Sequence, residues 1–180
     1  MRLLLDACVL YPVATREIVL AWAGAGGFTP LWSPRILEEW ALSVGAKQGP
    51  EAEARARGDI ALMRARWPES EVAPQGEGPA GLPDKADGHV IAAAMAGRAD
   101  AILTFNLRDF PRRALAPLGL SAFHPDAWLA GELAAEPARL RAALDPLAAA
   151  AEARGAPFRR FLRRAGLPRA GKAWERITAL

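Results

Sequence analysis

Short apolar segments that end in polar residues alternate along this chain with longer segments of helical periodicity. The first is Arg2–Leu5, which is followed directly by Asp6, and another is Ala101–Leu103, which is followed by a polar loop over Thr104–Pro111. Apolar runs of this length between helices indicate buried parallel strands joined by crossover helices. We therefore predict an α/β fold in which helices flank a central parallel sheet and ligands bind at the carboxyl ends of its strands.

Start and stop signals place the other elements. Ser33 and Pro34 predict the N-cap and first position of a helix whose Ile36, Leu37 and Trp40 face the core. The remaining predicted elements are, in chain order, a helix capped by Thr15, a strand over Phe28–Trp32, a helix over Glu51–Arg66, a Gly/Pro-rich loop over Pro74–Pro83, a helix capped by Asp84 and a strand over Leu120–Phe123.

The charge of the chain divides near residue 124. Residues 1–124 carry 13 basic and 14 acidic side chains, whereas residues 125–180 carry 10 and 6 and are rich in Ala, Leu and helix-breaking Pro. We predict an N-terminal domain over 1–124 and a basic region of three or four short helices over 125–180. Arg159, Arg160, Arg163 and Arg164 would form one cationic helix face, suited to a phosphate backbone, an acidic protein or solvent.

Composition excludes several classes of protein. No run of eighteen apolar residues is present and Asp6 interrupts the opening apolar segment, so we expect a cytoplasmic protein without a membrane span. The single cysteine, Cys8, cannot form an internal disulfide or a structural zinc site. Dinucleotide and P-loop binding would need a Gly-rich turn after the first strand, and the sequence there is DACVLYP.

Acidic residues recur where the predicted sheet would bring them together. Asp6 follows the first strand, Glu39 lies one turn into the Ser33 helix, Asp87 starts a later helix, and Asn106 follows the strand Ala101–Leu103. Ionised carboxylates repel one another unless a cation neutralises them. Oxygen ligands without a Cys or His set favour Mg²⁺, with Mn²⁺ as a substitute, over zinc.

Three segments resemble a known family. LLLDACVLYP, SPRILEEW and LPDKADGHVIAAAMAGRADAILTFNLRDFP, in this order, are similar to PIN domains of the kind found in VapC-type ribonuclease toxins of bacterial toxin–antitoxin pairs. The resemblance covers about residues 1–124 and implies a three-layer α/β fold, while the region beyond Pro125 resembles the C-terminal helical extension of some members.

The resemblance implies a catalytic, metal-binding set. Asp6 is similar to the first acid of the family, Glu39 to the second and Asp87 to the third, with Glu38 as an open alternative to Glu39. Asn106 stands at the fourth position, where many members have Asp. Either Asn106 or Asp109 would complete the site.

The implied reaction is metal-assisted hydrolysis of RNA phosphodiester bonds. Thr104 resembles the hydroxyl residue that holds the loop beside the site. The predicted substrate-binding residues are Thr104, Arg108, Arg112, Arg113, Arg160 and Arg164. A toxin of this type would also bind a small antitoxin protein and form a homodimer.

Other interpretations stay open. A phosphatase of the haloacid dehalogenase type would need an Asp at position 8, where this chain has Cys8. A PIN-like module that binds RNA or protein without catalysis would be consistent with Asn106 at the fourth position. We interpret Cys8 as a small buried apolar residue, and His89 and His124 as structural or surface residues. Trp22, Trp32 and Trp40 are expected to pack the core, as are Trp128 and Trp174, for which stacking on bases or on a partner helix is the open alternative.

Overall fold

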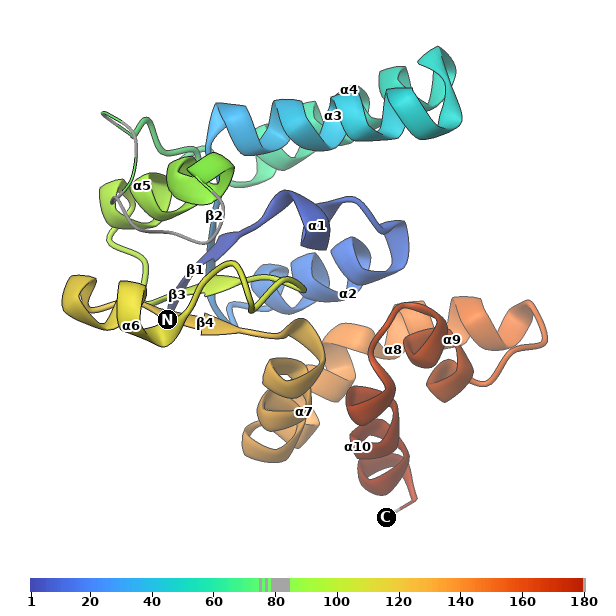
Figure 1. Cartoon of the computed structure of the whole chain (residues 1–180). Helices are drawn as coiled ribbons and strands as arrows, with labels where there is room; N and C mark the ends of the chain where they lie inside the picture. The colour runs from blue at the N-terminus through green and yellow to red at the C-terminus, as the bar shows by residue number, and fades with distance from the viewer. Residues whose placement is uncertain (75, 77, 79–84, 180) are drawn as a thin grey trace. The chain divides into compact units, whose positions relative to one another are not determined.

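The computed structural model describes residues 1–74, 76, 78 and 85–179 (Figure 1). The chain divides into two compact units. The first comprises Met1–Tyr11 and Thr29–Phe123, and the second comprises Pro12–Phe28 and His124–Leu180. Most of the predicted loop over Pro74–Pro83, and the predicted cap Asp84, lie outside the described residues.

A four-stranded parallel sheet forms the centre of the first unit. Its strands are β1 (Arg2–Leu5), β2 (Thr29–Leu31), β3 (Ala101–Leu103) and β4 (Ser121–Phe123). The strand order is β2-β1-β3-β4, so β1 and β3 are the two central strands. Leu4 pairs with Ile102 in register, and both side chains are fully buried. The residues that follow β1 and β3 therefore lie next to each other at the carboxyl edge of the sheet.

Helices and two 3₁₀ turns surround the central sheet of the first unit. They are α1 (Ala7–Leu10), α3 (Pro34–Gln48), α4 (Pro50–Arg66), the 3₁₀ turn η1 (Lys85–Asp87), α5 (Gly88–Ala96), α6 (Arg112–Leu115) and the 3₁₀ turn η2 (Ala116–Leu118). Figure 1 shows α3 and α4 running side by side, and the two helices are in contact. α5 is composed mainly of small and apolar residues and packs on β1 and β3, whereas α3 contacts α1.

The start of α3 confirms the capping prediction. Ser33 Oγ accepts a hydrogen bond from the Ile36 N–H at 3.3 Å, and Pro34 occupies the first helical position. Trp40, which follows Ile36 by one helical turn, is buried as predicted. The turn from α3 into α4 uses Gly49, whose φ of 91° is a conformation that side-chain-bearing residues rarely adopt.

The second unit is helical. It contains α2 (Val13–Gly24), α7 (Pro125–Ala135), α8 (Pro137–Ala153), α9 (Phe158–Arg164) and α10 (Pro168–Thr178). Buried polar contacts tie these helices together: Asp126 Oδ1 accepts a hydrogen bond from the Ala170 N–H at 2.9 Å. The rings of Phe158 and Trp174 pack edge to face with centroids 4.8 Å apart. The prediction of C-terminal helices is confirmed.

One predicted cap is wrong. α2 begins at Val13, two residues before Thr15, because Pro12 already supplies the extended N-cap backbone. The buried Thr15 hydroxyl donates instead to the Ala165 carbonyl oxygen at 3.0 Å. Pro12–Phe28, expected in the N-terminal domain, group with the C-terminal helices, and the domain division at residue 124 stays a prediction.

Candidate active site

Asp6 lies at the junction of β1 and α1. Its backbone is extended (φ −70°, ψ 151°), as required of the residue that precedes a helix. The Asp6 N–H donates to the Leu103 carbonyl oxygen at 3.1 Å, which extends the pairing of β1 with β3 by one hydrogen bond. The half-buried Asp6 side chain is thereby held beside the loop that follows β3.

The Thr104 hydroxyl links Asp6 to that loop. Thr104 is fully buried, and its Oγ1 donates to Asp6 Oδ2 at 2.7 Å. The same oxygen accepts a hydrogen bond from the Asn106 N–H at 3.0 Å. One hydroxyl therefore fixes both the first predicted ligand and the backbone of the fourth, while the Asn106 side chain is exposed.

Cys8 is a neighbour of Asp6 that the sequence interpretation missed. Its Sγ donates to Asp6 Oδ2 at 3.1 Å and accepts a hydrogen bond from the Phe105 N–H at 3.3 Å. Burial, together with the negative charge of Asp6, raises the pKa of the Cys8 thiol to about 12. The thiol is therefore protonated at neutral pH, and Cys8 acts as a polar contact rather than as a purely apolar filler.

Glu39 pairs with two basic groups. Its Oε1 lies 3.1 Å from His89 Nε2 on α5 and 3.1 Å from Arg35 Nε on its own helix. Burial raises the pKa of Glu39, but the hydrogen bonds and charges of His89 and Arg35 outweigh burial and hold that pKa below its ordinary value of 4.5. His89 is buried, which favours the structural over the surface interpretation of this residue, and its contact with Glu39 was not predicted.

The two neighbouring glutamates of α3 point to different helices. Glu38 is exposed and accepts two hydrogen bonds from Arg57 of α4, at 2.8 and 2.9 Å. These bonds lower the pKa of Glu38. Glu39 instead faces His89 of α5, two residues after Asp87. The geometry thus separates two carboxylates that the sequence alone left as alternatives.

Asp87 stands where η1 ends and α5 begins. It is half-buried and precedes the first residue of α5, and its carboxylate makes no hydrogen bond that caps the helix. Asp87 therefore directly precedes a helix, α5, that packs on both central strands β1 and β3.

The structure thus connects the predicted residues in two sets. Asp6, Thr104 and the Asn106 backbone are joined by hydrogen bonds, and Glu39 is joined to α5 through His89. Within the residues that the structure describes, no group of three or more Asp, Glu, His or Cys side chains is close enough to hold a metal ion. Ionised carboxylates that lack a cation repel one another, which opposes such a grouping.

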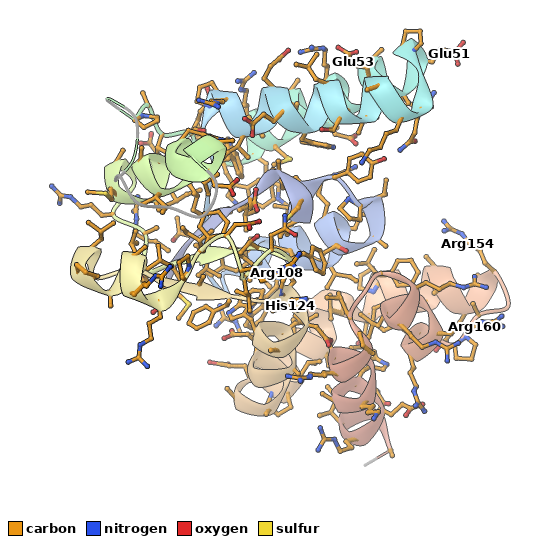
Figure 2. All side chains as sticks on the ribbon, in the orientation of Figure 1. Glu51, Glu53, Arg108, His124, Arg154 and Arg160 are labelled. Carbon is orange, nitrogen blue, oxygen red and sulfur yellow. The ribbon has the colours of Figure 1, made fainter. Side chains whose placement is uncertain are left out.

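Basic and acidic residues follow Asn106 in the same loop. The Asp109 N–H donates to the Asn106 carbonyl oxygen at 3.0 Å, and the Asp109 side chain is half-buried. Arg108, labelled in Figure 2, and the α6 residues Arg112 and Arg113 are exposed. The three guanidinium groups that follow β3 in sequence are therefore accessible to solvent.

A family model described as a PIN domain matches residues 2–108, which is more than half of the chain. The chain belongs to the PIN domain family. The match covers β1 with Asp6, α3 with Glu39, Asp87, and the β3 loop up to Arg108. The predicted fold class is confirmed for this PIN domain by both the family and the sheet.

This PIN domain is also similar to a curated protein of Mycobacterium tuberculosis (strain ATCC 25618 / H37Rv) named "Putative ribonuclease VapC50". The two are 49% identical over 47 residues, which are 26% of this chain and 28% of that protein. The matching segment thus spans less than a third of the relative. No solved structure gives a significant match. Among the described residues, no helix is both long and apolar enough to cross a membrane.

Proposed function

We propose that this PIN domain is a metal-dependent endoribonuclease, the toxin of a toxin–antitoxin pair. The observation that carries the proposal is the 2.7 Å hydrogen bond from Thr104 to Asp6, which fixes an acidic side chain at the carboxyl ends of the two central parallel strands. Family membership and the ribonuclease name of the relative support the same activity.

The donor atoms fit a hard divalent cation. Asp6, Glu39 and Asp87 supply carboxylate oxygens and Asn106 supplies an amide oxygen, the ligand types that Mg²⁺ and Mn²⁺ prefer. Asp6 Oδ2 is engaged by Thr104 and Cys8, and no hydrogen bond to Oδ1 is described. When bound there, the ion would lower the pKa of a water molecule and offset charge on the phosphate.

Glu39, rather than Glu38, is proposed as the second ligand. Glu38 is held away by Arg57 on α4, whereas Glu39 faces the helix that begins after Asp87. Asn106 is proposed as the fourth ligand because its backbone is tied to the hydroxyl that holds Asp6. Asp109, whose backbone is bonded to Asn106, is the alternative.

The exposed arginines after β3 would bind the substrate. Arg108, Arg112 and Arg113 follow the loop that carries Asn106, and guanidinium groups bind phosphate oxygens in pairs of hydrogen bonds. Such contacts position an RNA backbone without reading its bases. Thr104 is fully buried, so we assign it the task of holding Asp6 and the loop.

The same proposal includes the partners of a VapC-type toxin. These are a small antitoxin protein that blocks the acidic site and a second copy of the chain in a homodimer, with the cytoplasm as the place of action.

Incubation of total RNA with the purified chain tests the proposal. We expect discrete cleavage in Mg²⁺ and in Mn²⁺, none in EDTA, and none with Asp6→Asn. RNA binding that persists in EDTA without cleavage in any metal would instead establish a non-catalytic PIN-like binding module.

A further inference from the structure

The C-terminal helices α9 and α10 carry a dense group of exposed cations. Six of these residues are named here the α9–α10 basic surface: Arg160, Arg163, Arg164, Arg169, Lys172 and Arg176. All six are exposed, and no ion pair with an acidic side chain is described for any of them. Figure 2 shows Arg160 extending away from α9. Together α9 and α10 carry seven basic side chains and one acidic side chain, Glu175, so this part of the chain has a net positive charge.

One ion pair holds the two helices together beside this surface. Arg159 Nη1 lies 2.7 Å from Glu175 Oε2, and thereby joins α9 to α10. Arg163 follows Arg159 by one helical turn, and Lys172 precedes Glu175 by three residues, so each of these two cations lies on the side of its own helix that carries the ion pair. The side chains beneath are buried, with Phe158 packed on Trp174.

Buried hydrogen bonds also anchor α9 and α10 to other helices of the second unit. The Ala170 N–H at the start of α10 donates to the buried Asp126 carboxylate of α7 at 2.9 Å. The Ala165 carbonyl oxygen, at the end of α9, accepts from the buried Thr15 hydroxyl of α2. The cations are therefore mounted on a packed support, which reduces the entropy lost when a ligand binds.

The composition of the surface favours a polyphosphate ligand over a protein. The centre of a protein–protein interface is typically apolar and rich in aromatic residues. The large exposed apolar side chains of the described residues are Met1, Val13, Leu42, Leu62, Met95 and Leu107, and none belongs to α9 or α10. Five of the six cations are arginines, whose planar guanidinium groups match phosphate oxygens.

We propose that the α9–α10 basic surface binds the sugar–phosphate backbone of single-stranded RNA independently of metal and of base sequence. The choice of RNA among polyphosphates rests on the proposed function, and the surface would give the chain an RNA contact on its C-terminal unit in addition to the arginines after β3. Binding of this kind releases counterions, so its affinity falls steeply with salt.

Fluorescence anisotropy of a labelled single-stranded RNA, with the full chain in EDTA, tests the proposal. The test variant is Arg160→Gln/Arg164→Gln. The matched control is Arg55→Gln/Arg141→Gln, which removes two exposed arginines elsewhere; Arg55 is in α4, and Arg141 in α8 makes one ion pair, at 3.9 Å. A third variant, Arg160→Lys/Arg164→Lys, keeps both charges.

The proposal predicts that the slope of log affinity against log salt falls by about 1.4 in the glutamine test variant, since each phosphate contact on a single strand contributes about 0.7. The lysine variant and the control keep the wild-type slope, which separates a lost contact from misfolding. Equal slopes in the test and control variants would overturn the proposal. The proposal would also be overturned if the glutamine test variant lost binding to polyglutamate but kept its binding to RNA. That result would assign the surface to an acidic protein.

EDTA prevents metal-dependent hydrolysis, so this binding experiment does not depend on cleavage. If no metal supported cleavage, the proposed nuclease activity would be refuted, but the RNA-binding result for the α9–α10 basic surface would stay the same.

Discussion

The Thr104 hydroxyl donates a 2.7 Å hydrogen bond to Asp6 Oδ2, although 98 residues separate the two positions in sequence. The bond forms because β1 and β3 are parallel neighbours in register, so each strand delivers its following residue to the same edge of the sheet. Asp6 is therefore oriented by a buried group before any ligand binds.

Replacement of Thr104 by Val should disturb both stability and activity. Valine keeps the shape but leaves Asp6 and the Asn106 N–H without the hydroxyl, which should cost about 1–3 kcal/mol in the free energy of unfolding. Loss of the group that orients Asp6, the proposed first metal ligand, should also slow RNA cleavage by about 10–100-fold. Urea denaturation and an RNA cleavage assay measure the two effects. Thr104→Ser, which retains the hydroxyl, should stay close to wild type in cleavage rate, and equal losses in both variants would contradict this role.

The two glutamates of α3 should differ in their effect on metal binding. Glu39→Gln should weaken Mn²⁺ binding by about tenfold or more, because a carboxylate–cation contact is worth roughly 1–4 kcal/mol per unit charge. Glu38→Gln removes the same charge from the neighbouring residue but only breaks the exposed pair with Arg57. Isothermal titration with Mn²⁺ compares them. A larger loss in Glu38→Gln would reverse the assignment.

Cys8 should react slowly with alkylating reagents in the folded chain. Its pKa is raised from 9.0 to about 12, so at pH 8 its thiolate fraction is roughly 1000-fold below that of an ordinary cysteine. Iodoacetamide labelling in EDTA, followed by mass spectrometry, should show this slow rate, with fast labelling in guanidinium chloride. Fast labelling of the native chain would show that the thiol is neither buried nor beside the Asp6 charge.

The pairing of Glu39 with His89 and Arg35 should appear in the pH dependence of stability. The folded chain holds the pKa of Glu39 below the ordinary 4.5, so the ionised form stabilises the fold above pH 4.5. This contribution is lost as the pH falls through the lowered pKa. Urea denaturation in EDTA from pH 7 to pH 3 should therefore show the difference between wild type and Glu39→Gln shrinking on the acid side. A difference that grows with acidity would contradict the sign.

Local sequence signals predicted the strands that position the site. β1 was predicted with its observed ends because the three leucines that follow Arg2 stop at Asp6, and the predicted strand Phe28–Trp32 contains β2. The predicted burial of Trp22, Trp32 and Trp40 is confirmed as well. In each case the chemistry of a few consecutive residues decides the outcome.

Features that depend on distant contacts could not be predicted in this way. The His89–Glu39 contact forms because α3 and α5 meet in the folded chain, and the Cys8–Asp6 contact depends on the local geometry where β1 ends and α1 begins. Neither contact was predicted from the sequence. Thr15 has the chemistry of a helix cap, but its hydroxyl finds a buried acceptor 150 residues away. The packing of α2 against the C-terminal helices could not be predicted either, because it leaves no local pattern in the sequence.

The rate of cleavage of one defined RNA, measured over a Mg²⁺ titration with wild type and Asp6→Asn, tests whether this PIN domain is a metal-dependent nuclease. We expect a wild-type rate that rises with Mg²⁺ to saturation and is abolished by EDTA, and a rate lowered by at least about 100-fold in Asp6→Asn. Cleavage that persists in EDTA, or that is equal in the two proteins, would contradict a metal-dependent nuclease centred on Asp6.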